Sequence, residues 1–203
     1  SIMGTVFVDN IKHQSSQGSG TITIGASGET IKAASGAQNN IGIGGCQMFI
    51  LNATYGIVSA NTNELLTTWT DITDASFGGA GGGKIASLVS HSSGTFSFSE
   101  TGVYRINFHC YGYTASSAAR YSAGKIFSTT DNSTYEERAS GYFSIANLGT
   151  TSSSADATYI LDVTDTTNVK SRMYAISSNA AAVINGSNTI GQSYVTFTRL
   201  GDT

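Results

Sequence analysis

Strand-length runs of alternating or apolar residues, separated by turn residues, follow one another along the chain from residue 46 onward. The separators are rich in Gly, Ser, Asn and Asp, which supply the backbone conformations and local hydrogen bonds of turns. Many short strands without intervening helices are typical of an antiparallel sandwich or barrel. We therefore expect an all-β fold with strands near residues 47–51, 63–69, 84–89, 94–98, 103–113, 123–128, 139–146, 157–163, 168–176, 181–184 and 193–200. The run near 61–69 also allows a short helix, because Leu65, Leu66 and Trp69 have mixed spacing.

Alternation also predicts which side chains face the core, because neighbouring residues of a strand point to opposite faces. In the three clearest runs, the residues expected to point inward are Tyr104, Ile106, Phe108 and Cys110; Val169, Ser171 and Met173; and Val195 and Phe197. The residues expected to point outward, toward solvent or another subunit, are Arg105, Asn107 and His109; Lys170, Arg172 and Tyr174; and Tyr194, Thr196 and Thr198.

Residues 1–45 differ in texture from residues 46–203, and we treat them as a separate N-terminal attachment or shaft segment with short strands. Large apolar side chains are sparse there, and tracts such as Gln14–Gly20 favour turns. The conformational entropy lost in ordering so many residues far exceeds what the burial of so few apolar side chains returns. We therefore expect this segment to borrow a core from sister chains or from a larger assembly.

Charge and composition exclude several classes of partner and structure. The ten Lys and Arg residues are scattered singly and the net charge is −3, whereas a nucleic-acid-binding surface needs clustered cations. No apolar stretch approaches the ~18 residues of a membrane span, so we expect no membrane insertion. The chain has no proline, which excludes a collagen-like arm. Cys46 and Cys110 lie in no CxxC pair and are expected to be buried free thiols.

No arrangement of residues indicates catalysis, a cofactor or a metal ion. The three histidines are far apart in the sequence, with no HExxH pair, and no Gly-x-Ser-x-Gly elbow occurs. Glu136 and Glu137 are adjacent, so a strand would point them to opposite faces. Asp162 and Asp165 offer oxygens of the kind that calcium accepts, although an Asx-turn is the favoured interpretation. We predict no catalytic, cofactor-binding or metal-binding residue.

The segment Gly94–Phe108, with the sequence GTFSFSETGVYRINF, resembles the early strand pair of the complement-1q and tumour-necrosis-factor jelly-roll superfamily. In both, a strand with alternating Phe precedes a turn that ends in glycine, here Gly102, and a Tyr-x-Ile-x-Phe strand follows. The ending SYVTFTRLG at Ser193–Gly201 is similar to the last strand of that superfamily. Over residues 60–201 the resemblance implies an antiparallel jelly-roll head that trimerises, with Gly102 in an unusual backbone conformation.

The N-terminal segment resembles the shaft or attachment repeats of bacteriophage tail-fibre and virion-fibre proteins, through GTVFVDNIKH at Gly4–His13 and TITI at Thr21–Ile24. Such shafts are homotrimers of interwoven short strands. Together the two resemblances imply a homotrimer with an extended β-rich stalk and a jelly-roll head. The residues expected at the trimer interface are Val6, Val8, Ile11, Ile22 and Ile24 in the stalk and Tyr194 and Thr196 in the head.

These resemblances imply a non-enzymatic structural protein of the virion, whose stalk attaches to other virion structural proteins and whose head binds a glycan or protein of the bacterial surface. Tyrosine suits such surfaces because it combines a flat apolar ring with a hydroxyl. The candidate receptor-binding residues are Tyr111, Tyr113, Tyr121 and Tyr135, and Tyr142 belongs to the same group. Three alternatives stay open: a capsid decoration or head fibre, a secreted bacterial lectin or adhesin, and a fibre glycanase.

Overall fold

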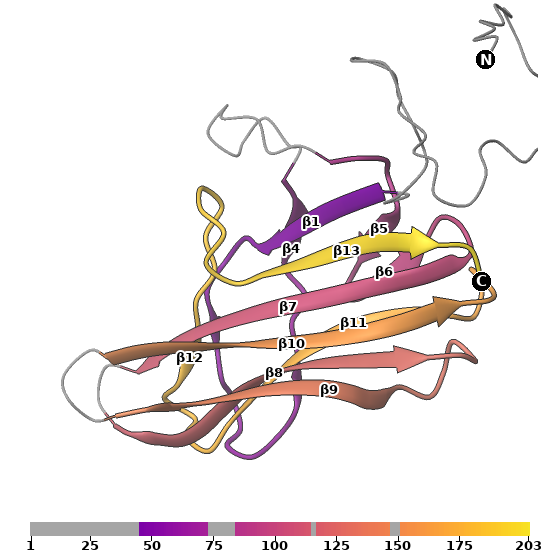
Figure 1. The fold of residues 1–203 in the computed structure, drawn as a ribbon. Coiled ribbons are helices and arrows are strands. Elements are labelled where there is room, and N and C mark those ends of the chain that lie inside the picture. The colour runs from indigo at the N-terminus through magenta and orange to yellow at the C-terminus, as the bar shows by residue number, and fades with distance from the viewer. Residues whose placement is uncertain (1–44, 73–83, 115–116, 147–150) are drawn as a thin grey trace, which may run out of the picture. The chain divides into compact units, whose positions relative to one another are not determined.

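The computed structural model describes residues 45–72, 84–114, 117–146 and 151–203, and in these ranges every helix or strand assigned is a β-strand. The strands form two antiparallel sheets that face each other across one core. Figure 1 labels most of them: β1 (Gly45–Leu51), β2 (Tyr55–Gly56), β3 (Glu64–Leu65), β4 (Trp69–Asp71), β5 (Val89–Ser92), β6 (Thr95–Phe98), β7 (Gly102–Thr114), β8 (Ala119–Thr129), β9 (Glu136–Ile145), β10 (Thr151–Val163), β11 (Lys170–Ser177), β12 (Val183–Ile184) and β13 (Tyr194–Gly201).

Sheet A has the strand order β10–β7–β13–β1–β4, and the short β12 and β2 continue it beside the end of β7. Sheet B has the order β5–β6–β11–β8–β9, with β3 also beside β11. Neighbours within a sheet come from distant parts of the chain, since β1 pairs with β13 and β8 with β11. This topology is a jelly roll, and it confirms the predicted all-β antiparallel sandwich.

Aromatic rings from both sheets fill the centre of the core. Between ring centroids, Phe96 of sheet B lies 5.0 Å from Phe197 and 5.3 Å from Phe49 of sheet A. Trp69 meets Phe96 and Phe108 edge-on at 5.7 and 5.9 Å. Such edge-to-face pairs stabilise a core beyond the apolar area that they bury. All five rings are buried, as alternation predicts for Phe108 and Phe197.

The predicted faces of β7, β11 and β13 are confirmed with one exception. Every residue expected to point inward is buried, and the outward ones are half-buried or exposed except Thr198. Thr198 is covered because Cys46, opposite it on β1, lies beside its hydroxyl, with Sγ at 3.7 Å.

Gly102 has the expected unusual conformation, with φ of 144°. A Cβ there would lie 2.6 Å from the carbonyl oxygen of Gly201.

The strand predicted at residues 84–89 is wrong. In this segment Ile85 makes only an isolated bridge with Cys46, and β5 begins at Val89. Ala86 has a φ of 68°, and a positive φ at a residue with a Cβ interrupts extended backbone. Of the apolar side chains in this run, Leu88 is buried in the core, whereas Ile85 is 64% exposed.

The run at 63–69 forms two short strands, β3 and β4, so neither one long strand nor a helix is present there. Leu66 is buried between them, and the indole Nε1 of Trp69 donates to its carbonyl oxygen at 2.8 Å. The two-residue β2 was not predicted. β10 begins at Thr151, earlier than expected, because its first half carries small polar residues that pair with β7 without apolar alternation.

The predicted stalk lies outside the described residues apart from Gly45, and so do its expected interface residues Val6, Val8, Ile11, Ile22 and Ile24. Their roles stay predictions. Within the described ranges, no helix has the length and apolar character needed to cross a membrane.

Candidate functional site

The outer face of sheet B, formed by side chains of β8, β9 and β11 that point away from sheet A, carries a continuous set of rings and cations. Alternation along β11 places Arg172 and Tyr174 there, and antiparallel pairing sets Phe127 and Lys125 of β8 directly beside them. Four ring or cation contacts and these two cross-strand pairs connect seven side chains, which we call the aromatic ladder: Tyr121, Tyr142, Lys125, Tyr174, Phe127, Arg172 and Tyr135.

Tyr142 is the most exposed member of the aromatic ladder, with 56% of its surface open to solvent. It lies on β9 opposite the small side chain of Ala123, and its ring meets that of Tyr121 edge-on at 6.0 Å. The Tyr121 hydroxyl donates to Oδ1 of Asn61 at 2.5 Å. This hydrogen bond fixes Tyr121, which in turn supports the exposed ring of Tyr142.

Lys125 is buried although it points to the outer face. Its Nζ donates to Oε2 of Glu137 at 2.8 Å and lies 5.8 Å from the ring centroid of Tyr142. Burial acts to lower the pKa of Lys125, but the hydrogen bond to Glu137 and its charge, together with Tyr142, raise that pKa overall. Lys125 is therefore a fixed positive charge beneath the exposed ring.

The other end of the aromatic ladder is built around the guanidinium of Arg172. Its Cζ lies 3.8 Å from the ring centroid of Tyr135, a cation–π contact, and its Nε donates to the Thr95 hydroxyl at 3.0 Å. Phe127 and Tyr174, with centroids 4.5 Å apart, connect this end to the middle. The Tyr135 hydroxyl is buried and has no hydrogen-bond partner among the described residues.

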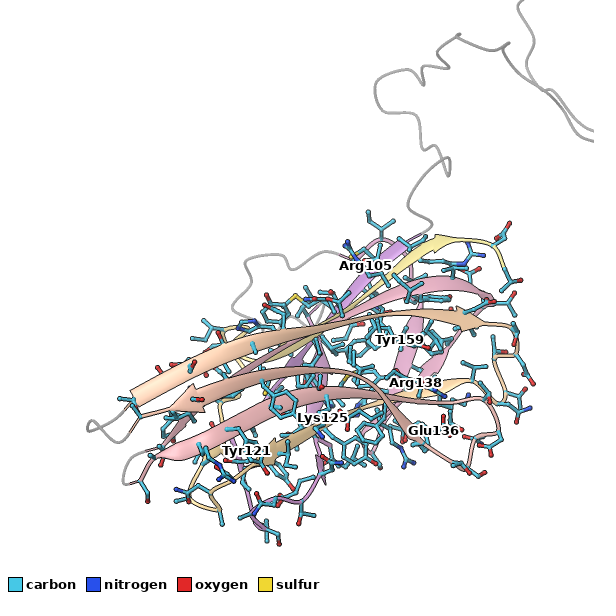
Figure 2. All side chains as sticks on the ribbon, turned by 60° about the horizontal axis from the view of Figure 1, so that its bottom comes forward. Arg105, Tyr121, Lys125, Glu136, Arg138 and Tyr159 are labelled. Carbon is cyan, nitrogen blue, oxygen red and sulfur yellow. The ribbon has the colours of Figure 1, made fainter. Side chains whose placement is uncertain are left out.

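The two adjacent glutamates of β9, Glu137 and Glu136, lie opposite Phe127 and Ser128 of β8, next to a β-bulge at Arg138. Glu137 binds Lys125, whereas Glu136 accepts from Nη2 of Arg138 at 2.8 Å. Figure 2 shows Tyr121, Lys125, Arg138 and Glu136 in this order along β8 and β9. Each glutamate thus neutralises its own cation, and the pair does not share a site of the kind that acid–base chemistry uses.

The outer face of sheet B has an excess of positive charge, although the whole chain has a net charge of −3. Its alternate positions carry the cations Lys125, Lys170 and Arg172 and one carboxylate, Glu137. Lys170 donates to the backbone carbonyl of Thr166. Among the described residues, neither Lys170 nor Arg172 is paired with a carboxylate, so both charges can act on a ligand.

The outer face of sheet A is different, with two carboxylates, Asp156 and Asp162, near one arginine. Across this face His109 Nδ1 lies 3.0 Å from Oδ1 of Asp156, and the His109 ring stacks on Tyr194 at 5.0 Å with an interplanar angle of 20°. Nearby Ile160 is 49% exposed and lies opposite Arg105. The face combines a polar row with an exposed apolar side chain.

The structure places the four candidate receptor-binding residues on two different surfaces. Tyr121 and Tyr135 lie at opposite ends of the aromatic ladder, whereas Tyr111 and Tyr113 lie at outward positions of β7 on sheet A. Tyr194 and Thr196, predicted at the trimer interface, are at outward positions of β13 on that same sheet. The receptor-binding and interface roles of these residues stay predictions.

Sequence reasoning did not select Lys125 or Arg172 as binding residues. Alternation already placed Arg172 on the outward side of its strand, and that was the available signal. What it could not reveal is the register that places β8 between β11 and β9.

Two further titratable groups, Asp165 and His91, serve the local structure. Asp165 Oδ1 accepts from the backbone N–H of Thr167 at 2.7 Å, which confirms the favoured Asx-turn, and Asp162 lies exposed on β10. His91 accepts from the backbone N–H of Gly94 through Nε2 at 2.9 Å, and burial lowers its pKa. Within the described ranges, no group of three His, Cys, Asp or Glu side chains is arranged to hold a metal ion.

Both cysteines are free thiols, as predicted, although Cys46 is only half-buried. Cys110 is fully buried, and burial raises the pKa of its thiol to about 12. The thiol therefore stays protonated and unreactive in the folded chain.

No protein-family model and no curated protein matches the chain. Solved structures do match. Murine APRIL at pH 8.5 superposes with a TM-score of 0.52 at 6% identity, covering 77% of this chain and 98% of that chain. Eiger TNF from S. frugiperda superposes with a TM-score of 0.51 at 14% identity, covering 78% and 93%. At such identities the likeness establishes the fold alone, which is a tumour-necrosis-factor-like jelly roll.

Proposed function

We propose that this protein is a non-enzymatic, homotrimeric virion fibre protein of a bacteriophage, and that its jelly-roll head binds the surface of the host cell. The observation that carries the binding role is the aromatic ladder, a row of rings and cations on the solvent face of a sheet. Binding surfaces are enriched in tyrosine and arginine. The trimer and the virion context follow from the resemblances of the head and of residues 1–45.

We assign the two expected roles, contact between subunits and receptor binding, to different outer faces of the sandwich. The outer face of sheet A holds Tyr194 and Thr196 together with the exposed Ile160, and it is the face we assign to contact between subunits. The outer face of sheet B then stays open, with Tyr142 available to a receptor. Contact through sheet A would also cover Tyr111 and Tyr113, so the assignment removes these two tyrosines from the receptor surface.

The first test is the mass of the full chain in solution by sedimentation equilibrium at micromolar concentration. The proposal requires three times the 21.0-kDa chain mass, and a monomer would contradict it. Replacing Ile160 with Asp should lower that mass, because a desolvated carboxylate would oppose the contact. The same change at Ile190, equally apolar and exposed but in the β12–β13 loop, should leave the mass unchanged.

The second test places the chain in an intact particle by antibody–gold labelling and electron microscopy. Labelling at the tail would support host attachment. Labelling at the capsid would assign the chain to decoration of the head, and its absence from every particle would favour a secreted lectin or adhesin.

A further inference from the structure

We infer that the aromatic ladder and the neighbouring Lys170 form a binding site for an acidic polysaccharide, in which the ring of Tyr142 stacks on a sugar and Arg172 and Lys170 bind its acidic groups. This inference rests on the proposed function and names the chemical class of the receptor. It differs from the sequence prediction, because Tyr111 and Tyr113 have no part in it.

The ring of Tyr142 offers the apolar contact that a sugar needs. A pyranose presents C–H groups on one face and hydroxyls around its rim, so it stacks on a flat ring that is held in place and open to solvent. Tyr142 meets both conditions, since it is 56% exposed and supported by Tyr121. Ser140 lies on the same face of β9 and is exposed, so its hydroxyl is available for the rim of the sugar.

The positive charges favour an acidic ligand over a neutral one. Lys125 is already neutralised by Glu137, whereas Lys170 and Arg172 have no carboxylate partner in the described part of the chain. Arg172 donates a hydrogen bond from Nε to the Thr95 hydroxyl. The two terminal nitrogens of its guanidinium are therefore available to bind a carboxylate or sulfate, the groups that arginine binds best. Arg120, whose Cζ lies 5.9 Å from the Tyr121 ring, adds a further cation at the ladder's edge.

The size of the ladder indicates a chain of sugars and not a single one. Tyr142 and Arg172 are two strands apart and two outward positions apart along the strands, which corresponds to roughly 15 Å in a β-sheet. An extended oligosaccharide of a few units can reach both, with Phe127 and Tyr174 beneath its middle. Charge complementarity selects this occupant over a second copy of the chain, because the other outer face has only two carboxylates and one of them, Asp156, is bound to His109.

The test uses the full-length chain and four polymers, with affinities measured by biolayer interferometry at low and physiological salt. Dextran sulfate and polygalacturonate are acidic polysaccharides, dextran is their neutral counterpart, and polyglutamate is a polyanion without sugar. We expect the two acidic polysaccharides, or the one whose acid group fits, to bind at least tenfold more tightly than dextran and polyglutamate. Binding should weaken as salt rises, because screening reduces the attraction of exposed charges.

Two variants with matched controls locate the site. Tyr142→Ala should weaken binding on the order of tenfold, as truncation of an aromatic anchor does, whereas Ile190→Ala removes an equally exposed apolar side chain elsewhere and should change nothing. Arg172→Gln should weaken binding on the order of fivefold and flatten its salt dependence. Arg105→Gln removes one cation from sheet A and should do neither. Thermal melts confirm that each variant is folded.

Equal affinity for dextran and dextran sulfate, equal affinity for polyglutamate, no binding to any polymer, or a Tyr142→Ala variant that behaves like Ile190→Ala would each overturn the inference. These outcomes are distinct from failure of the proposed function, which is decided by the mass of the chain and its place in the particle. A trimer found on the tail that ignores acidic polysaccharides would sink this inference alone.

Discussion

The edge of the sandwich where β9 meets β10 can be tested with one added methyl group. No ladder of hydrogen bonds joins these strands in the described ranges, so the contact along them rests on side-chain and backbone packing. Gly141 of β9 faces β10 there. A Cβ built at Gly141 would lie 2.4 Å from the carbonyl oxygen of Asp156 and 3.2 Å from Cβ of Ala155.

The cost of Gly141→Ala can be worked from this geometry. Ordinary contact begins at 3.4 Å, so β9 and β10 must separate by about 1 Å. Overpacking of this kind costs about 1–3 kcal/mol, and the alanine returns about 0.4–1 kcal/mol by restricting the unfolded chain. The midpoints of these ranges give a net loss of about 1.3 kcal/mol, which for a chain of this length lowers the Tm by about 3–5 °C.

The measurement is chemical and thermal unfolding, with all proteins at one concentration because assembly would contribute to stability. Gly56→Ala is the matched control, since a Cβ there meets nothing within 4 Å. An unfolding free energy for Gly141→Ala equal to that of Gly56→Ala would refute the close packing of β9 on β10. Gly141 also lies between Ser140 and Tyr142, so a displaced β9 should weaken binding of dextran sulfate in the same variant.

Three further predictions concern individual side chains. Glu137→Gln should destabilise the fold by about 1 kcal/mol, since it leaves the buried Lys125 without its carboxylate while Glu137 itself is partly exposed; Glu136→Gln, at a more exposed pair, should have almost no effect in the same urea titration. Burial holds the pKa of His91 below 6.5, so as the pH falls the imidazole is protonated in the unfolded chain before it is protonated in the folded one. The stability that the neutral His91 contributes is therefore complete above pH 6.5 and is lost as the pH falls through the lowered pKa. His91→Gln should therefore flatten the loss of stability that begins as the pH falls below about 6.5, above the range in which most carboxylates titrate, and an unchanged profile would count against the buried imidazole. Cys110, with its pKa raised to about 12, should escape alkylation by iodoacetamide at pH 8 until denaturant is added, as mass spectrometry of the peptides would report.

Alternation was sufficient to predict the parts of the fold in which one face of a strand is buried along its whole length. In β7 the run from Val103 to Cys110 alternates without a break, and the burial of its side chains follows the prediction. The prediction failed at residues 84–89, where the positive φ of Ala86 interrupts the strand. Nothing in the neighbouring residue types signals that conformation, which directly follows the bridge between Ile85 and Cys46.

The candidate site could be predicted only in part, for a related reason. The sequence places Arg172 and Tyr174 on the outward side of one strand, and tyrosines were already expected to form the recognition surface. That Tyr142 and Lys125 lie on the same surface depends on the pairing of β8 with both β9 and β11. Register between distant strands follows from packing of the whole sandwich, and a bulge such as the one at Arg138 shifts it by one residue.

The position of β13 has a consequence for how the protein is made. This strand, the last of the thirteen described, lies between β7 and β1 in the interior of sheet A, and its Val195 and Phe197 are fully buried. In a nascent chain that has left the ribosome only as far as β12, no strand lies between β1 and β7. The apolar core therefore stays exposed to water, and the sandwich cannot finish folding until β13 has been synthesised. A polypeptide cut short before residue 194 would therefore leave sheet A incomplete and be a target for proteases and chaperones.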